Sequence, residues 1–339
     1  MSLEAGDFTI RPYQPGDEQA ILDGFNFVFR EVNGEGYVDR ELDFWRWEFM
    51  ENPHGYRIWV ALTPDGVVAA HYGGVPYRMV TNLGELFFTH IVDSYSHPAY
   101  RRMRKPGLFV LTGQAWLEEC KAKGDATSYG YPVVAAQRVG SRFLGYTPIR
   151  IVDYLCRPTA LEPLGLPASV SAERVASPGA DAEALFATMA AEKGCLAHRG
   201  AAYLKWRYAQ IPGDDYEIWE IRRDGGLCGV VVLRPIHELV PGACTIADWL
   251  AAEGDDEACQ AMLAVADTRA REVGRDRVMA VFPPDSAEAA ALSRAGFLLE
   301  PSDQYLERRL NHIPMDHPEV STEWLAAHWW YTLGDSDLV

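Results

Sequence analysis

Long apolar runs are absent from this sequence of 339 residues. A membrane-spanning helix needs about 20 consecutive apolar residues, and no segment approaches that length although 48% of the residues are hydrophobic. The N-terminus also lacks the charged and then apolar pattern of a secretory signal. We therefore expect a soluble, cytoplasmic protein that does not bind membranes.

Paired cysteines are absent as well. The six cysteines are spread singly, with no CxxC pair and no zinc-ligand spacing with histidine. Disulfide frameworks and zinc sites both need such groupings. We expect reduced, mostly buried thiols and no metal site. These cysteines are Cys120, Cys156, Cys195, Cys228, Cys244 and Cys259.

Positive charge is scarce, because 31 Lys and Arg residues face 48 Asp and Glu residues, a formal net charge of −17. A general nucleic-acid-binding protein needs a basic surface to neutralise phosphates, so this class is excluded. An acidic surface is commonly a solubility device, although it also favours cationic substrates. One short basic run stands out from this background: Arg101, Arg102, Arg104 and Lys105.

An internal repeat is present between residues 40–75 and 199–235. The sequence FWRWEFMENPHGYRIW in the first segment matches YLKWRYAQIPGDDYEIW in the second, and HIVDSY (90–95) matches TIADWL (245–250) further on. Trp and Tyr at helical spacing indicate a shared core more often than a ligand pocket. The matched pairs include Arg40 with Arg199, Trp47 with Trp206, Tyr56 with Tyr216, Trp59 with Trp219, and Asp93 with Asp248.

Each copy shows the same order of elements. Switches between period 3.6 and period 2 predict two helices, a β-hairpin, a strand ending in Asp, a long helix, a strand, a short helix and a last strand. Such alternation predicts an α/β fold, with a mixed sheet covered by helices on both faces. We predict an N-terminal domain over 1–157, a linker over 158–177, a C-terminal domain over 178–310 and a tail over 311–339.

The two copies differ most after the strand that ends in Asp. The first copy continues SYSHPAYRRMRKPGLF, so that positive charges and Gly107 precede a helix whose N-terminus favours anions. The second copy continues LAAEGDDEACQ, with acidic residues that cap a helix and repel a pyrophosphate. Solvated surface charge is the alternative interpretation of the basic run. Its position after a strand of an open α/β sheet favours a ligand site in the first copy.

The segments VDSYSHPAYRR, GLF, SYGYP and SRFLGYTPI, in this order, resemble the GNAT superfamily of N-acetyltransferases, and specifically its bacterial tandem-repeat members. The resemblance covers about residues 8–157 and 171–310. It implies two tandem GNAT-like mixed sheets flanked by helices, and a loop after the fourth strand that binds the pyrophosphate of acetyl-CoA or another acyl-CoA. The implied cofactor-binding residues are Ser94, Tyr95, Arg101, Arg102, Arg104, Lys105, Gly107 and Leu108.

The chain also departs from the family pattern. The loop is longer than usual, and Phe109 replaces its second small residue. Many relatives carry a tyrosine general acid where this chain has Ser141 in the first copy and Leu292 in the second.

Three residues are candidates for proton transfer: His90, Asp93 and Tyr131. Alternation along the strand predicts that His90 and Asp93 lie on opposite faces. Because Asp93 recurs as Asp248, a structural role is favoured over a catalytic one. Tyr131 shares a face with Tyr129 and is a candidate proton donor to the departing thiolate, although a core or sheet-face role is favoured for both tyrosines.

The resemblance implies direct acyl transfer to a small amine or amino sugar, with the first copy active and the second a scaffold. The alternative is a non-catalytic acyl-CoA-binding or interaction module. We expect a monomer or homodimer with a small-molecule amine substrate. The tail either packs its aromatic residues or brings a carboxylate of Asp335, Asp337 or Val339 into the active cleft.

Overall fold

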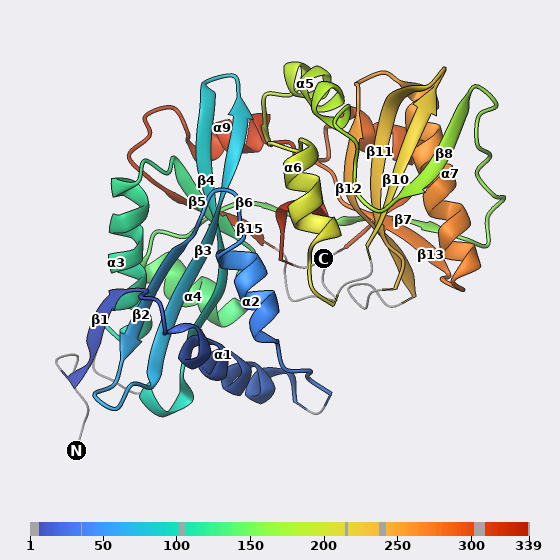
Figure 1. Ribbon diagram of the computed structural model, residues 1–339. Helices are drawn as coiled ribbons and strands as arrows, with labels where there is room; N and C mark the ends of the chain where they lie inside the picture. The colour runs from blue at the N-terminus through green and yellow to red at the C-terminus, as the bar shows by residue number, and fades with distance from the viewer. Residues whose placement is uncertain are drawn as a thin grey trace. The chain divides into compact units, whose positions relative to one another are not determined.

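Two separate mixed β-sheets form the framework of the chain (Figure 1). The computed structural model describes residues 7–34, 36–101, 106–213, 216–236, 242–301 and 309–337. Contacts divide the chain into unit 1 (1–78, 86–148 and 311–322) and unit 2 (79–85, 149–310 and 323–339). Within the described ranges, no helix has the length and apolar character required to cross a bilayer.

The first sheet has the strand order β1-β2-β3-β4-β5-β15-β6. Its β4 and β5 run parallel, whereas β1–β2, β2–β3 and β5–β15 are antiparallel pairs. The elements are β1 (Thr9–Pro12), α1 (Glu18–Asn33), α2 (Leu42–Phe49), β2 (Arg57–Leu62), β3 (Val68–Thr81), β4 (Gly84–Ser96), a 3-10 turn (Pro98–Tyr100), α3 (Leu108–Ala122), β5 (Thr127–Gly130), α4 (Val134–Phe143), β6 (Thr147–Ile151) and β15 (Arg309–Pro314).

The second sheet has the corresponding order β8-β10-β11-β12-β13-β7-β14. β9, named below with its neighbours in the chain, pairs with the end of β3 and so belongs to the first sheet. The elements are β7 (Tyr154–Pro158), β8 (Val170–Val175), α5 (Ala182–Glu192), β9 (Cys195–Ala197), α6 (Ala201–Leu204), a π-helical turn η3 (Lys205–Ala209), β10 (Glu217–Arg223), β11 (Gly226–Arg234), β12 (Ala243–Ala251), α7 (Asp256–Glu272), β13 (Arg277–Ala280), α8 (Ala287–Arg294), β14 (Leu298–Glu300), α9 (Thr322–His328) and a 3-10 turn η5 (Leu333–Asp335).

Two adjacent glycines in β3 let helices approach the first sheet from both faces. A Cβ atom added to Gly73 would lie 3.3 Å from the Phe49 ring of α2. One added to Gly74 would lie 2.6 Å from the Trp116 ring of α3. Since neighbouring strand residues point to opposite faces, α2 and α3 cover opposite sides of the sheet. Any larger side chain at either position would displace a core aromatic ring.

A buried ion pair connects the α3 side of unit 1 to the strands. Arg57 on β2 donates to the Asp125 carboxylate at 2.9 and 2.6 Å, and Thr89 on β4 donates to it at 2.7 Å. The indole of Trp116 donates to the Arg57 carbonyl at 2.8 Å. These bonds satisfy polar groups that burial would otherwise leave unpaired.

The next-to-last strand in the order of each sheet comes from the other repeat of the sequence. In the first sheet, β15 lies between β5 and β6, although it follows the second repeat. In the second sheet, β7 lies between β13 and β14, although it follows the first repeat. The two copies have therefore exchanged equivalent strands.

This exchange changes the predicted domain boundaries. Residues 149–157, predicted to end the N-terminal domain, group with unit 2, and residues 311–322 of the predicted tail group with unit 1. The predicted linker 158–177 contains β8, an edge strand of the second sheet. Hydrophobic pattern alone shows where a strand is but not which sheet it joins. The cysteines agree with expectation, since all six are free and four are buried.

The exchange predicts that a fragment of residues 1–148 does not fold stably, because β5 would lack its β15 neighbour. Joining residues 309–322 to that fragment through a flexible linker should restore folding. Circular dichroism and amide NMR dispersion would measure both. A cooperatively folded 1–148 fragment would contradict the prediction.

Candidate functional site

The parallel pair β4–β5 ends before β4 does. Its register joins Phe88 to Thr127, Thr89 to Ser128 and His90 to Tyr129. β5 ends at Gly130, whereas β4 continues to Ser96. In the described part of the chain, residues 91–96 therefore have no strand partner on the β5 side. We call this segment the open edge of β4.

An aromatic cluster lies where the pairing ends. The His90 ring stacks on Tyr129, with 4.7 Å between centroids and 11° between planes. Tyr131 approaches His90 edge-on at 6.3 Å, and Tyr77 of β3 lies at 6.4 Å. The structure thus brings together His90 and Tyr131, two of the three predicted proton-transfer residues. His90 is 2% exposed, whereas Tyr131 is partly exposed.

Asp93, the third candidate, forms an ion pair with Arg40. The Arg40 guanidinium lies 4.4 Å above the Phe25 ring of α1 and 4.5 Å above the Phe44 ring of α2. It also lies 3.4 Å from Glu48. Because a cation between aromatic rings and two carboxylates is well held, the Asp93 carboxylate has a structural partner.

The backbone at Asp93 corrects the prediction about faces. Asp93 has a φ of 53°, a left-handed conformation that interrupts the strand's alternation. His71 on β3 stacks with Tyr95 on the α1 side of the sheet. Tyr77, six residues after His71 and hence on the same face, contacts His90. His90 and Asp93 therefore lie on the same face, and the prediction of opposite faces is wrong.

The ion pair recurs in unit 2. Arg199 Nε donates to Asp248 at 2.8 Å, and Tyr208 donates to the same carboxylate at 2.9 Å. Arg199 also pairs with Asp335, and all three charged side chains are at most 1% exposed. The register of β12 against β11 shifts next to Asp248. In both units an Arg–Asp pair stabilises an irregular fourth strand, and its members are matched residues of the sequence repeat.

The start of α3 lies after the open edge. Gly107 is its N-cap, and its carbonyl accepts bonds from the amides of Val110 and Leu111 at 3.0 and 3.1 Å. The first amides of a helix have no intrahelical acceptor and favour anions. A Cβ added to Gly107 would meet no atom of the described residues within 4 Å. The Leu108 side chain is buried and offers only its backbone to a ligand.

The other predicted cofactor-binding residues have mixed environments. Arg101 is exposed and donates to the Ser96 carbonyl at 2.9 Å. The Tyr95 hydroxyl donates to the Ile21 carbonyl at 2.9 Å, and burial raises the pKa of Tyr95 well above its usual value. Only the backbones of Tyr95 and Ser94 therefore border the open edge. Arg102, Arg104 and Lys105 lie outside the described residues.

The matching helix start in unit 2 is occupied by acidic side chains. Asp255 caps α7 by accepting a bond from the Ala258 amide at 3.0 Å. Arg223 pairs with Asp255 at 2.6 Å and with Glu257 at 3.3 Å. An incoming phosphate would meet these carboxylates, so the two helix starts differ in charge as the sequence indicates.

The C-terminal segment covers the matching strand edge in unit 2. The pairing of β12 with β13 ends at Thr245 and Met279, whereas β12 continues to Ala251. Trp330 packs on Phe282, with 5.9 Å between ring centroids, and Phe282 packs on Trp249 of β12 at 5.7 Å.

The turn η5 follows, and its Asp335 pairs with Arg199. A Cβ added to Gly334 would lie 3.1 Å from Asp248. The tail thus packs its aromatic residues within unit 2, and Val339 lies outside the described residues.

Neither a protein-family model nor a curated protein matches the sequence. Solved structures do match. A conserved protein of unknown function from Enterococcus faecalis V583, described as a probable N-acyltransferase, superposes with a TM-score of 0.69 at 13% identity, over 91% of this chain and 73% of its own. A GCN5-related N-acetyltransferase from Anabaena variabilis gives 0.65 at 16% identity, over 90% and 72%.

A tandem GNAT protein from the clavulanic acid biosynthesis pathway gives a TM-score of 0.56 at 13% identity, over 91% of this chain and 98% of its own. The chain has the GNAT fold. The predicted fold class, two tandem GNAT-like mixed sheets flanked by helices, is thereby confirmed. Identities of this size establish the fold alone.

Two residues of strand β3 were not predicted as site residues from the sequence. His71 donates from Nδ1 to the Asp93 carbonyl at 2.8 Å, and Tyr77 borders His90. Both lie on β3 at positions of the same parity. The available signal was the segment HYGGVPY, in which His71 and Tyr77 share strand parity with Gly73.

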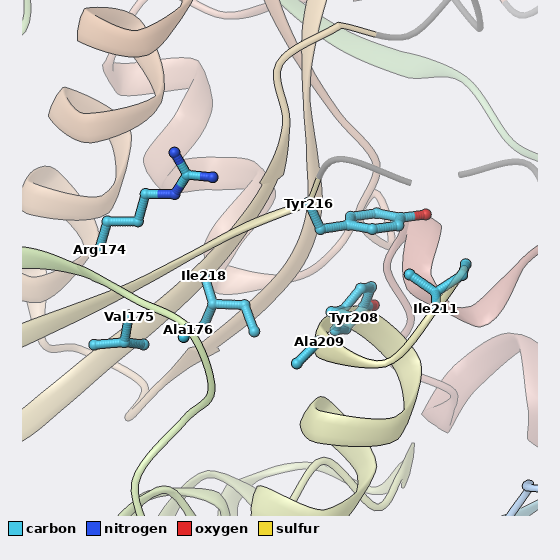
Figure 2. A pocket seen from close by; sticks show the side chains of 8 residues that line it. All are labelled: Arg174, Val175, Ala176, Tyr208, Ala209, Ile211, Tyr216 and Ile218. Atoms are coloured by element: carbon cyan, nitrogen blue, oxygen red, sulfur yellow. The ribbon is translucent and has the colours of Figure 1, made fainter. Parts of the chain in front are cut away.

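Unit 2 also contains a cavity of about 370 Å³ between β8, β10 and η3 (Figure 2). In unit 1, the Tyr13 ring packs on Trp45 at 5.7 Å and on Tyr56 at 5.4 Å. Tyr13 bonds to Ile58, and Val175 faces the matching Ile218, so Val175 is the counterpart of Tyr13. The cavity is lined by Arg174, Val175, Ala176, Tyr208, Ala209, Ile211, Tyr216 and Ile218. Val175 has the smaller side chain of the two counterparts.

The two Arg–Asp pairs predict unequal stability losses. Arg199→Ala leaves Asp248 and Asp335 buried without their cation and should cost about 3–5 kcal/mol of unfolding free energy. Arg40→Ala, whose arginine is 23% exposed, should cost about 1–2 kcal/mol. Urea denaturation of both variants measures the difference, and equal losses would contradict it.

The cavity comparison predicts opposite effects of reciprocal substitutions. Val175→Tyr should fill part of the cavity and stabilise unit 2 by about 1 kcal/mol. Tyr13→Val, the matched control, should destabilise unit 1 by about 2–4 kcal/mol. Thermal melts measure both effects, and a destabilised Val175→Tyr protein would show that the cavity cannot accept the ring.

Proposed function

We propose that unit 1 binds an acyl-CoA, such as acetyl-CoA, and transfers its acyl group to a small amine. The observation that carries this proposal is that β4 continues to Ser96 beyond its last β5 partner, with the start of α3 following. The fold supports it, since the solved structures with this fold include GCN5-related N-acetyltransferases.

Each part of an acyl-CoA has a complement in unit 1. The pantetheine arm is extended and carries amide groups, so it can add to an exposed strand edge as another strand would. The open edge of β4 offers such an edge. A pyrophosphate favours the N-terminus of a helix, and α3 begins at Leu108, with no described atom within 4 Å of a Cβ added to Gly107.

The transfer is a substitution at the thioester carbonyl. The amine nitrogen forms a bond to the acyl carbon, the carbon–sulfur bond breaks, and the amine loses a proton while the thiolate gains one. Backbone amides of the open edge stabilise the developing negative charge on the carbonyl oxygen. Tyr131, partly exposed beside His90, supplies the proton to the thiolate, and His90 orients its ring. Solvent water takes the proton that the amine loses and returns one to the Tyr131 oxygen, so that protons balance.

Unit 2 serves as a scaffold in this proposal. Its corresponding strand edge is covered by Trp330 and η5, and its helix start carries Asp255 and Glu257. A second acyl-CoA would have to displace the tail and overcome repulsion between like charges.

The alternative is an acyl-CoA-binding module without catalysis, and one observation favours it. Ser141, at the place of the family's tyrosine acid, donates to the Tyr146 carbonyl at 3.1 Å. The short Ser141 side chain is thus directed to the backbone of Tyr146.

Calorimetric titration with acetyl-CoA tests binding. We expect one site per chain, and loss of binding when Arg102 and Arg104 are both changed to Glu. The matched control changes Asp256 and Glu257 of the unit 2 helix to Lys, which should leave binding unchanged. Absence of binding to the unmodified protein would refute the proposal, and equal losses in both variants would refute the assignment to unit 1. Thiol release with a panel of amines then separates an enzyme from a binding module.

A further inference from the structure

A completely buried histidine lies beneath the open edge. His71 of β3 is 0% exposed, and its Nδ1 lies 2.8 Å from the carbonyl oxygen of Asp93. Its ring stacks with Tyr95, with 5.4 Å between centroids, and meets the edge of Phe49 at 6.4 Å. The ring is therefore fixed on both sides, and its one hydrogen bond goes to the backbone of the irregular strand.

The direction of this hydrogen bond follows from its acceptor. A carbonyl oxygen only accepts, so Nδ1 of His71 carries the proton. Nε2 then carries a lone pair, and no described residue hydrogen-bonds to it. Burial lowers the pKa of His71 below its usual value, so the ring is neutral near pH 7.

The bond determines where the next amide points. In a planar trans peptide the carbonyl and the following N–H point in opposite directions. The Asp93 carbonyl is directed to the His71 ring, so this bond fixes the plane of the Asp93–Ser94 peptide. The His97 N–H bonds to the Ala69 carbonyl of β3 at 2.9 Å, and because N–H groups alternate in side along a strand, the Ser94 N–H is directed away from β3. β5 is the neighbour on that other side of β4, and its pairing has ended by this point. The Ser94 N–H thus faces the open edge.

Unit 2 provides an internal comparison. His71 pairs with Val60 in the β2–β3 register, and the matching pair in unit 2 is Val230 with Glu220. The unit whose edge is covered by its own tail therefore has valine in place of the histidine donor. In the described part of unit 2, Asp248 accepts side-chain bonds from Arg199, Tyr208 and Thr332 at the irregular strand.

We propose that His71 is a positioning residue that aims the Ser94 N–H at the thioester carbonyl of the bound acyl-CoA. This proposal rests on the proposed function of unit 1. Arg40 holds the Asp93 side chain and His71 holds its carbonyl, so the Asp93–Ser94 peptide is fixed from two directions. His71 itself touches neither reactant.

Two substitutions separate the donor from the ring. His71→Phe keeps an aromatic ring between Tyr95 and Phe49 but removes the donor. His71→Asn keeps an N–H donor at the δ position. We expect His71→Phe to lower kcat by about 10–100-fold with little change in acetyl-CoA affinity, as for a weakened oxyanion contact. His71→Asn should recover most of that kcat.

A matched control addresses folding. His312 of β15 is also 0% exposed and bonds to Thr127 and Thr322. His312→Asn should lower the melting temperature without lowering kcat. If His71→Phe fails to fold, His71→Asn against His71→Val provides the same comparison.

The outcomes are distinguishable. If the unmodified protein transfers acyl groups and His71→Phe keeps its kcat, the role of His71 is refuted and the proposed function stands. If the unmodified protein transfers none, the proposed function fails. The NMR shift of the Ser94 amide on adding acetyl-CoA then tests His71 separately, because the shift should be present in the unmodified protein and lost in His71→Phe. An unmoved Ser94 amide in the unmodified protein refutes the proposal.

Discussion

The ion pair between Arg40 and Asp93 supports the part of unit 1 on which its chemistry would depend. Asp93 adopts a left-handed backbone conformation in the middle of a strand, and such a residue is retained only where its surroundings hold it. Arg40 provides that hold from the α1 and α2 side, between the rings of Phe25 and Phe44. Without it, the Asp93 carboxylate would lose its cation, and only the His71 bond to the Asp93 carbonyl would hold this residue from a side chain.

The two units show how the same fold can leave the edge of its fourth strand open in one copy and cover it with the tail in the other. Both have an Arg–Asp pair at the irregular fourth strand, and in both this strand outlasts its parallel neighbour. In unit 2 the burial of Trp330 and the pairing of Asp335 with Arg199 satisfy that edge. Burial raises the pKa of Asp335, and Arg199 opposes that rise. The charge of Asp335 therefore depends on Arg199, which Asp335 contacts only when the tail is packed.

The fold class and the matching of Arg40 with Arg199 and of Asp93 with Asp248 could be predicted from the sequence, because repeats preserve spacing and the strand and helix periods are distinct. That these matched residues form ion pairs could not, because the partners are far apart in the chain. The sheet faces on which His90 and Asp93 lie could not be predicted, because an aspartate in the left-handed region has no distinctive sequence pattern around it. His71 was missed for a related reason. Its role depends on a carbonyl 22 positions away in sequence, and backbone groups carry no signature in the residues that they belong to.

Strand exchange was equally invisible, because β7 and β15 have ordinary strand patterns and nothing local specifies their sheet. Its consequence is physical linkage. β15 pairs with β5 at Tyr129, the residue on which His90 stacks, so the end of the second repeat stabilises the aromatic cluster of unit 1. The second repeat is therefore not free to be lost. It supplies a strand whose absence would expose the edge of β5, and an exposed edge next to an already open β4 would leave the site without a rigid side.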